Sequence, residues 1–523
     1  MSRVLVTEKI AQPGLDQLTA AGHDVDVQLD LSPEQLLEAI KGAHALIIRS
    51  ATTVTPEVLE AGTDLIVVGR AGIGLDNVDV AKATELGVMV VNAPQSNILS
   101  AAEQAMALLL SVARNTPQAH AALVNGKWER AKWEGVELYS KTLGVVGLGR
   151  IGALVAQRAL AFGMRLVAYD PFVSADRART MGVELMSLDD VLAQADFITI
   201  HLPKNKDTLG LFNAETLAKC KKGLRIINTA RGGIIDEAAL AEAIVSGHIG
   251  GAGIDVFAKE PTTESPLFGL PEVVVTPHLG ASTVEAQDKA GATIAEQVEL
   301  ALAGDFVPFA VNVSAGDVSE MVRPFMGLAE ELGRFFGCLQ ESNLKKVEIS
   351  YQGELAGTGT GILTLSILKG LFASTSDDPV SYVNAPALAE LRGLQVEESS
   401  TLTSPDYVNL ITVRSAEHSV SGTLASVGTK VEPRIVSVEG HGVEVPPAPH
   451  MLVVRNDDRP GVIGAIGTVL GEAKLSISSM AVAPDKVAGT ALMVLSTDEV
   501  VPDAILDELR GVEGISEIHQ VTL

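Results

Sequence analysis

The chain has 523 residues, of which 65 are Asp or Glu and 39 are Lys or Arg, so its formal net charge is −26. This length predicts about three or four domains, and the negative charge argues against duplex nucleic acid or an anionic membrane as a partner. Two cysteines, Cys220 and Cys338, are too few for a disulfide framework. With neither an apolar N-terminal leader nor an apolar run of membrane-spanning length, we expect a soluble, cytoplasmic protein.

The first part of the chain, residues 3–97, alternates short apolar runs with helical segments. This alternation is typical of a parallel α/β domain. One helix start is especially clear, because Ser32 is a suitable N-cap and Pro33 suits the first helical position. A long helical pattern over residues 98–113 then leads away from this domain.

The stretch LGVVGLGRIG places a short apolar run before Gly147, Gly149 and Gly152, which have the G-x-G-x-x-G spacing. In a strand–turn–helix unit the first glycine permits a tight turn, the second lets the backbone approach a diphosphate, and the third lets the helix pack closely. The helix N-terminus offers free amides to that diphosphate. The next predicted strand ends at Asp170, whose carboxylate suits the ribose hydroxyls of NAD and would repel the 2′-phosphate of NADP.

The rest of the chain predicts further domains. A second α/β pattern continues to about residue 277, and a helical pattern after Gly280 returns the chain to the first domain. Mixed strand patterns follow from Lys345, then a proline-rich linker at 446–450 and the order βαββαβ. We expect an α/β protein with two doubly wound parallel-sheet domains, one Rossmann and one discontinuous and flavodoxin-like, then an α+β domain and a βαββαβ domain. The predicted domains are 1–97 plus 285–313, 98–284, 314–449 and 450–523.

Three segments place ionisable side chains just after predicted strands, where open parallel sheets bind ligands. They are INTARGG with Arg231, GIDVFAKEP with Glu260 and VVVTPHLGAS with His278. Oxidation of an alcohol by hydride transfer needs a base for the hydroxyl proton and a cation that holds the substrate. His278 oriented by Glu260 suits the first role, and Arg231 has the fork geometry for a carboxylate. Each residue taken alone is more often an ordinary surface or capping residue.

Other histidines are weaker candidates. His201, at the end of FITIHLP, is a rival base, although its position on the adjacent strand favours a place beside the cofactor. The remaining histidines show no spacing typical of metal ligands, so no metal site is predicted.

The segments GLGRIG, INTARGGIIDE, GAGIDVFAKEP and TPHLGAS resemble the D-isomer-specific 2-hydroxyacid dehydrogenases, and the resemblance covers residues 3–313. Within that family, RSATTV, GRAGIGLDNVD and NAPQSNILSAAE are similar to the members that act on 3-phospho-D-glycerate, and the C-terminal part resembles their long form, with an intervening, allosteric-type domain and a terminal ACT domain. The resemblance implies an NAD-dependent oxidoreductase that makes 3-phosphohydroxypyruvate in the first step of serine biosynthesis. It also implies a homo-oligomer, either a dimer or a tetramer.

The resemblance assigns roles to individual residues. The implied catalytic set is Arg231, Glu260 and His278. The positions implied to bind NAD are Ile73, Gly147, Gly149, Arg150, Ile151, Gly152, Asp170, Leu202, Thr229, Ala230, Arg231, Asp255, His278, Leu279, Gly280 and Ala281. The positions implied to bind the substrate are Arg49, Ser50, Asn97, Arg231 and His278, with Arg49 as the phosphate ligand.

The turn RNDDRPG in the terminal domain precedes a helix whose N-terminus can receive the carboxylate of an amino acid. ACT domains that resemble this one bind serine as a feedback inhibitor between paired subunits. The candidate effector residues are Asn456, Asp457, Asp458 and Ser476. Serine-sensitive relatives typically carry asparagine at the position of Ser476, so we expect a weaker or different effector. A purely structural, dimer-forming role is the alternative.

Two other functions stay open at this stage. Another D-2-hydroxyacid dehydrogenase, such as a glyoxylate or hydroxypyruvate reductase, would share the catalytic set, but the long C-terminal extension argues against it. A non-enzymatic NAD-sensing co-repressor would share the fold, but the sequence shows no peptide-binding or nuclear-targeting feature.

Overall fold

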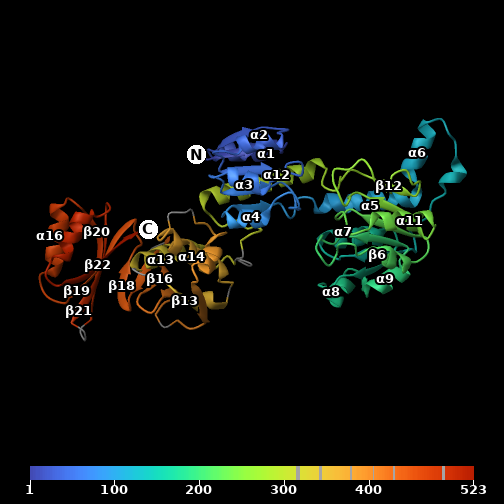
Figure 1. The fold of residues 1–523 in the computed structure, drawn as a ribbon. Helices are drawn as coiled ribbons and strands as arrows, with labels where there is room; N and C mark the ends of the chain where they lie inside the picture. The colour runs from blue at the N-terminus through green and yellow to red at the C-terminus, as the bar shows by residue number, and fades with distance from the viewer. Residues whose placement is uncertain are drawn as a thin grey trace.

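The computed structural model describes residues 1–313, 319–340, 344–357, 359–376, 380–404, 406–427, 430–485 and 489–523. Within these ranges the chain forms four sheets, and the five-stranded sheet lies between the seven-stranded sheet and the C-terminal half (Figure 1). The predicted fold class is confirmed. The predicted boundary between residues 313 and 314 adjoins residues 314–318, which lie outside the described residues.

The first sheet is parallel and has the flavodoxin-like order β2-β1-β3-β4-β5. Its strands and helices are β1 (Arg3–Val6), α1 (Gln12–Ala20), β2 (Asp24–Val27), α2 (Pro33–Ala39), β3 (Ala45–Ile48), α3 (Pro56–Ala61), β4 (Val67–Arg70), α4 (Val80–Glu85) and β5 (Met89–Asn92). Ser32 caps α2 in a capping box with Gln35, as the Ser-Pro signal predicts. The later helix α12 (Val284–Ala303) packs on α1 and β4, so the discontinuity of this domain is also confirmed.

The second sheet is parallel, with the order β12-β11-β10-β9-β6-β7-β8. Its strands are β6 (Thr142–Val146), β7 (Arg165–Tyr169), β8 (Glu184–Leu185), β9 (Phe197–Ile200), β10 (Leu224–Asn228), β11 (Ile249–Ile254) and β12 (Val273–Val275). Its helices are α5 (Ile98–Arg114), α6 (Thr116–Val124), the 3₁₀ helix η1 (Arg130–Trp133), α7 (Arg150–Ala161), α8 (Ala175–Thr180), α9 (Leu188–Gln194), α10 (Ala214–Ala218) and α11 (Glu237–Val245). Because β6 lies between β7 and β9, the strand order reverses beside the glycine-rich turn, where such sheets bind ligands.

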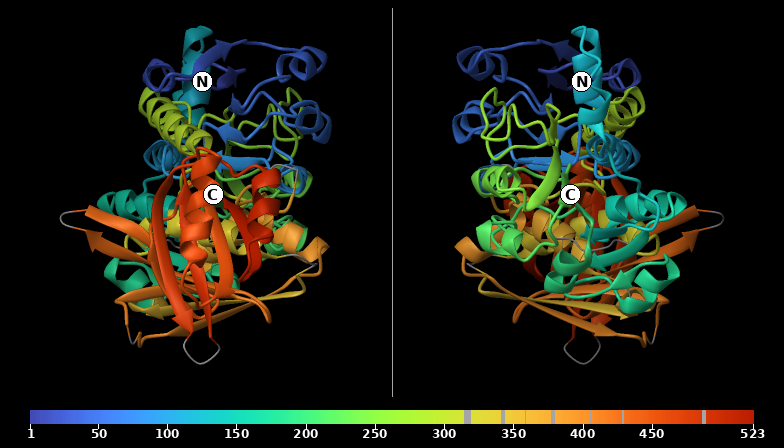
Figure 2. Two further views of the ribbon diagram at one scale, coloured as in Figure 1. Left: turned by 90° about the vertical axis from the view of Figure 1, so that its left-hand side faces the viewer. Right: turned by 90° about the vertical axis from the view of Figure 1, so that its right-hand side faces the viewer.

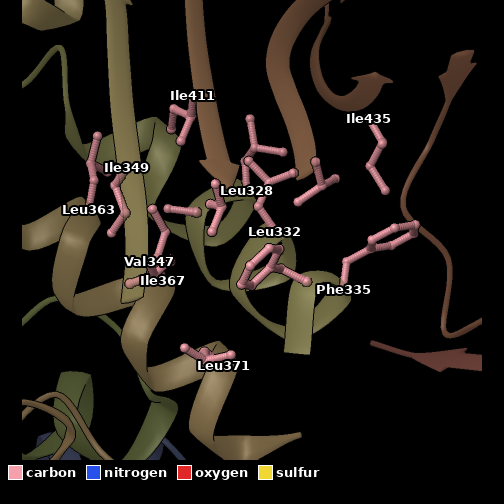
Figure 3. Close-up of a cluster of buried hydrophobic side chains, with 14 of the residues drawn as sticks. Leu328, Leu332, Phe335, Val347, Ile349, Leu363, Ile367, Leu371, Ile411 and Ile435 are labelled. Atoms are coloured by element: carbon pink, nitrogen blue, oxygen red, sulfur yellow. The ribbon is translucent and has the colours of Figure 1, made fainter. Parts of the chain in front are cut away.

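The third sheet has the order β14-β13-β15-β16-β17-β18, with β13 and β14 parallel and the other pairs antiparallel. Its elements are η2 (Arg323–Phe325), α13 (Met326–Leu339), β13 (Lys346–Gly353), η3 (Glu354–Gly357), α14 (Gly361–Ala373), α15 (Ala385–Leu391), β14 (Gln395–Thr401), β15 (Asn409–Arg414), β16 (Ser419–Val427), β17 (Lys430–Val438) and β18 (His441–Val445). Side chains of α13 and α14, including Leu332, Phe335 and Ile367, form its core with the sheet (Figure 3).

The fourth sheet is antiparallel, with the order β20-β21-β19-β22. Its elements are β19 (His450–Asp457), α16 (Val462–Glu472), β20 (Ile477–Asp485), β21 (Thr490–Thr497), α17 (Asp503–Arg510) and β22 (Ile515–Thr522), which confirms the predicted βαββαβ order. Helices α16 and α17 pack on one face of this sheet and form a separate apolar cluster with it. This face is turned toward the viewer in the left panel of Figure 2.

The two C-terminal sheets share one core. Met451, Val453 and Val494, on the face of the fourth sheet opposite α16 and α17, are buried in the same cluster as α13, α14 and β13. The predicted linker at 446–450 is a short loop, and its last residue, His450, already begins β19. The C-terminal half therefore has a continuous apolar interior. Over the described residues, no helix combines the length and apolar character that crossing a membrane requires.

Candidate active site

The turn between β6 and α7 forms a cradle of backbone atoms. Gly147 has a φ of 97°, in the left-handed region, and a Cβ there would lie 2.6 Å from the carbonyl oxygen of His201. A Cβ on Gly152 would lie 2.1 Å from the carbonyl oxygen of Gly147, so the close approach of α7 requires glycine. A Cβ on Gly149 would meet no described atom within 4 Å, and no side chain caps α7. This open cradle at a helix N-terminus fits a diphosphate such as that of NAD.

Asp170 lies beside this cradle, just after β7. One of its oxygens accepts a hydrogen bond from the Leu148 amide at 2.8 Å, and the other accepts from Phe172 at 2.8 Å and Val173 at 3.2 Å. The carboxylate is thereby fixed where a Rossmann unit binds ribose. Thr229, just after β10, has a buried hydroxyl with no hydrogen-bond partner among the described residues. A buried hydroxyl without a hydrogen bond destabilises the folded protein, so this hydroxyl is also a candidate to bond a ligand atom.

Other residues implied to bind NAD lie around the same edge. Arg150 and Ile151 open α7, and the Leu202 side chain lies close to the Gly147 turn. The Ile73 carbonyl accepts a hydrogen bond from Asn92 at 2.7 Å, in the loop after β4.

Asp255 lies behind the cleft rather than on its surface, since it is fully buried. Its carboxylate accepts hydrogen bonds from the Thr276 hydroxyl at 2.5 Å and from the amides of Leu279 at 2.8 Å and Gly280 at 2.9 Å. Burial raises the pKa of this carboxyl, and these hydrogen bonds offset only part of the effect. The carboxylate of Asp255 thus supports the loop that carries His278 to Ala281, and its contact with NAD stays a prediction.

His278 and Glu260 form a close pair. The His278 Nδ1 lies 2.6 Å from the Glu260 Oε2, and the Glu260 Oε1 accepts a hydrogen bond from the Phe257 amide at 2.8 Å. Burial raises the pKa of Glu260, but the hydrogen bonds from His278 and Phe257 and the charges of His278 and Arg231 outweigh burial, so the net pKa is lowered. Because an ionised carboxylate can only accept a hydrogen bond, Nδ1 carries the proton and donates it to Glu260 as a hydrogen bond, which leaves Nε2 as the basic nitrogen of the imidazole.

His278 also has an unusual backbone. Its φ is 54°, in the left-handed region that non-glycine residues rarely adopt. Its amide donates to the carbonyl oxygens of Asp255 at 2.9 Å and Thr276 at 3.0 Å, which holds this conformation. Strained backbone that the surroundings enforce is typical of functional sites.

A cavity of about 600 Å³ lies between the carboxyl ends of the first two sheets. The second sheet contributes His278 and Glu260 to its walls, and the first contributes Arg49, Ser50 and Arg70. The predicted base and the predicted phosphate ligand, Arg49, therefore line one cavity, although they come from different domains.

Arg70 was missed in the sequence interpretation. Burial, together with the charges of Arg231 and Arg49, lowers its pKa to about 10, so it is still protonated at neutral pH. Its Nε is buried without a hydrogen-bond partner among the described residues. The available signal was its position as the last residue of a parallel strand next to the strand that precedes Arg49.

Asn97 lies in a smaller neighbouring cavity of about 20 Å³ that Arg49 also lines. The Oδ1 of Asn97 is buried without a hydrogen-bond partner among the described residues. The residues predicted to bind the substrate from the first domain are thus brought close together.

Arg231 does not line the large cavity. Its Nε lies 3.4 Å from the Asp76 Oδ2, and its Nη1 donates to its neighbour's carbonyl, that of Ala230, at 2.7 Å. A Cβ on Gly74 would lie 2.5 Å from the Arg231 Nη2, so the guanidinium lies directly over that loop of the other domain. Arg231 therefore spans the two domains at the edge of the site.

His201 is a poor candidate for the base. Burial lowers its pKa to about 4, and its Nε2 lies 2.9 Å from the Thr199 hydroxyl. Its carbonyl packs under Gly147, which places it on the cofactor side of the cleft. The described residues contain no group of three or more His, Cys, Asp or Glu side chains suited to a metal ion.

The candidate effector residues do not converge within one chain. Asn456 is buried, and Asp457 and Asp458 follow it at the end of the sheet where Asp457 pairs with Thr490. The Ser476 amide instead donates to Asp498 at 2.8 Å, beyond the opposite end of β21. The length of β21 separates the two groups.

Comparison with known proteins agrees with this architecture. Residues 106–280 match the family model of the D-isomer specific 2-hydroxyacid dehydrogenase NAD binding domain, residues 321–439 that of the D-3-phosphoglycerate dehydrogenase intervening domain, and residues 450–514 that of the ACT domain. The D-3-phosphoglycerate dehydrogenase of Mycobacterium tuberculosis is 49% identical over 99% of both chains.

Solved structures resemble somewhat more than half of the chain. A crystal structure of a Thermus thermophilus protein matches this chain with a TM-score of 0.55 and 36% sequence identity. The match covers 59% of this chain and 99% of the Thermus protein. The NAD-dependent formate dehydrogenase from Staphylococcus aureus, in complex with NAD, has a TM-score of 0.52 and 30% identity, over 57% of this chain and 95% of that chain. Since relatives align along almost its whole length, the chain belongs to the D-3-phosphoglycerate dehydrogenase family of the D-isomer-specific 2-hydroxyacid dehydrogenases.

Proposed function

We propose that this chain oxidises 3-phospho-D-glycerate to 3-phosphohydroxypyruvate with NAD, in the first step of serine biosynthesis. The observation that carries this proposal is the cavity that has the His278–Glu260 pair on one side and Arg49 and Arg70 on the other. A substrate with both a reacting hydroxyl and a phosphate needs a base and cations at separate positions, and this cavity offers both.

The chemistry divides between the chain and the nicotinamide, which accepts the hydride from C2 when it is bound. The His278 Nε2 takes the proton of the C2 hydroxyl, so the alcohol loses one proton and one hydride and becomes a ketone. Glu260 stabilises the imidazolium that forms and holds the ring in its orientation. Arg231 binds the substrate carboxylate and the developing carbonyl, which requires its guanidinium to leave Asp76.

The phosphate is bound by Arg49, Ser50 and Arg70. A chain with a net charge of −26 must gather positive charge locally to bind a phosphorylated acid, and these arginines lie near each other at the carboxyl ends of β3 and β4. Their mutual charge repulsion, which contributes to the lowered pKa of Arg70, would be relieved by the dianion.

Steady-state kinetics with 3-phospho-D-glycerate and unphosphorylated D-glycerate test this function. Two charge-assisted hydrogen bonds of about 1.5 kcal/mol each predict a kcat/KM at least about 100-fold higher for the phosphorylated substrate. Equal values would instead favour a general D-2-hydroxyacid dehydrogenase. The same assay with NADP should give much lower activity than with NAD, because Asp170 would repel the 2′-phosphate.

We also propose that the protein is a cytoplasmic homo-oligomer, dimeric or tetrameric, with an amino-acid effector. α6 has no buried residue and projects from the body of the molecule (Figure 1), with Leu123 and Val124 exposed at its end and Trp128 exposed just after it. Such apolar exposure favours burial against a second copy. Because the effector residues lie at opposite ends of the ACT sheet, a shared effector site would need two copies. Light scattering and calorimetric titration with serine test both points.

A further inference from the structure

Glu8 contacts the loop that carries two of the proposed phosphate ligands. It follows β1, and the loop 49–52 follows β3, the strand paired with β1 in parallel, so both lie at the same edge of the sheet. The Glu8 Oε1 accepts hydrogen bonds from the amides of Arg49 at 2.8 Å and Thr52 at 2.9 Å, and its Oε2 accepts from Ala51 at 3.1 Å. One carboxylate thus binds three amides of this short loop.

The same loop is held from its other side by Asn77. The Asn77 Nδ2 donates to the carbonyl oxygens of Arg49 at 2.8 Å and Thr52 at 2.6 Å. The hydroxyls of Thr7 and Thr52 lie 2.9 Å apart. Three amides and two carbonyls of the loop are therefore bound within the protein, while Arg49 and Ser50 line the cavity.

The position of Glu8 is unexpected on electrostatic grounds. A negative charge beside a phosphate site repels the phosphate, so charge alone would select against it. The loop amides converge on one point, as they do where backbone binds anions, but Glu8 already occupies that point. Three of the loop amides are thus not free for the phosphate, so the loop must bind it mainly through side chains, whose direction depends on the shape of the loop.

We propose that Glu8 is a positioning residue for phosphate selectivity, whose carboxylate holds the loop 49–52 so that Arg49 and Ser50 face the substrate. This inference rests on the proposed function and adds a residue that touches neither the substrate nor NAD. It also explains why a carboxylate is kept near a cluster of arginines: Glu8 orders the amides of the loop, and its charge favours the protonated form of Arg70.

The test compares Glu8→Ala and Glu8→Gln with the parental enzyme on both substrates. Loss of charge-assisted bonds worth about 1.5 kcal/mol predicts a roughly tenfold higher KM for 3-phospho-D-glycerate in Glu8→Ala. The KM for D-glycerate and the kcat should change less than about threefold, because the base and the nicotinamide site keep their geometry. The inhibition constant of inorganic phosphate as a competitor should rise with the KM.

Glu8→Gln is the decisive variant because it keeps the size of the side chain. It retains one acceptor oxygen but turns an NH₂ group toward a loop amide, so the KM for the phosphorylated substrate should rise by a smaller factor. Glu38→Gln is the matched control: Glu38 is an exposed carboxylate of α2, paired with Lys41, and its loss removes the same charge away from the cavity. NADH titration of each variant checks that the site is folded.

The direction of the change in KM distinguishes a positioning role of Glu8 from simple charge repulsion of the phosphate. A lower KM for 3-phospho-D-glycerate in the Glu8 variants would mean that repulsion dominates and would overturn the proposal, and so would equal increases for both substrates. A parental enzyme without preference for the phosphorylated substrate would instead overturn the proposed function itself, before any variant is compared.

Discussion

At the scale of single residues, His278 combines a left-handed backbone with a 2.6 Å contact to a carboxylate. The backbone hydrogen bonds to Asp255 and Thr276 fix its position, and Glu260 fixes the ring. Catalysis by such a base depends on its geometry first and its pKa second. The structure thus offers the imidazole in one orientation before the substrate arrives.

Replacement of this imidazole should affect chemistry far more than cofactor binding. His278→Ala should lower kcat by about 10²- to 10⁴-fold, the range for a lost general base, while the NADH dissociation constant changes little. Steady-state rates and fluorescence titration measure the two quantities. Near-parental turnover across neutral pH would exclude His278 as the base, and the low pKa of His201 makes that residue a weak substitute.

The lowered pKa of Glu260 predicts a pH dependence of stability. A carboxyl whose folded-state pKa is lowered contributes stability that is present above its unfolded pKa and is lost as the pH falls through the folded value. The difference in unfolding free energy between the parental enzyme and Glu260→Gln should therefore shrink as the pH falls below 4.5, the ordinary pKa of a glutamate. Urea unfolding at a series of pH values measures it, and a difference that grew on acidification would contradict the prediction.

At the scale of elements, the turn from β6 to α7 assigns different tasks to neighbouring glycines. Gly152 allows α7 to approach the strand, whereas Gly149 faces open space. The first task concerns packing and the second concerns access of a ligand to backbone amides.

Two alanine substitutions should separate these tasks. Gly152→Ala should lower both the melting temperature and the NADH affinity, because its Cβ would lie 2.1 Å from a backbone oxygen. Gly149→Ala should keep a melting temperature near the parental value, because the φ of −71° at position 149 suits alanine. The added methyl group should nevertheless lower NADH affinity by about tenfold or more. Thermal unfolding and NADH titration distinguish them. If Gly149→Ala bound NADH normally, the diphosphate would lie elsewhere.

At the scale of the whole molecule, the C-terminal domains are joined more closely than a linker implies. Val453 on β19 is buried in the same cluster as Ile349 on β13. Glu439, after β17, contacts His418 at 2.6 Å and also forms an ion pair with Arg455 of β19. The ACT sheet and the intervening domain therefore share a packed surface.

The shared core predicts coupled unfolding. Val453→Ala removes buried methyl groups and should destabilise the C-terminal half by about 1–3 kcal/mol. Amide hydrogen exchange should accelerate in parallel in β13 and β21, because one cooperative unit contains both. Faster exchange confined to β21 would show that the two domains unfold independently.

The intervening domain also reaches the first domain. Val383 is buried with Met89 and Val91 of β5, and the Ser381 hydroxyl donates to the Gly87 carbonyl at 2.9 Å. β5 leads into the segment that contains Asn97. The intervening domain thus packs on the strand that leads to Asn97.

By itself, the sequence determined the order of the elements, the two parallel sheets, the glycine-rich turn and the family, because each of these depends on patterns within a few neighbouring residues. Ser32 and Pro33 start α2, and Gly147, Gly149 and Gly152 mark their turn, without help from distant parts of the chain. The residues assigned to the site remain a proposal that the kinetic experiments test.

Only the tertiary structure decided which distant side chains share an environment. Parallel strands gather residues far apart in sequence at one edge of a sheet, which is why Arg70 joins Arg49 and why Glu8 reaches the loop 49–52. Burial likewise depends on all surrounding elements, so Asp255 lies behind its loop and Val453 lies in a core shared by two domains. These contacts depend on many residues that lie far apart in the sequence, so no local pattern in the chain predicts them.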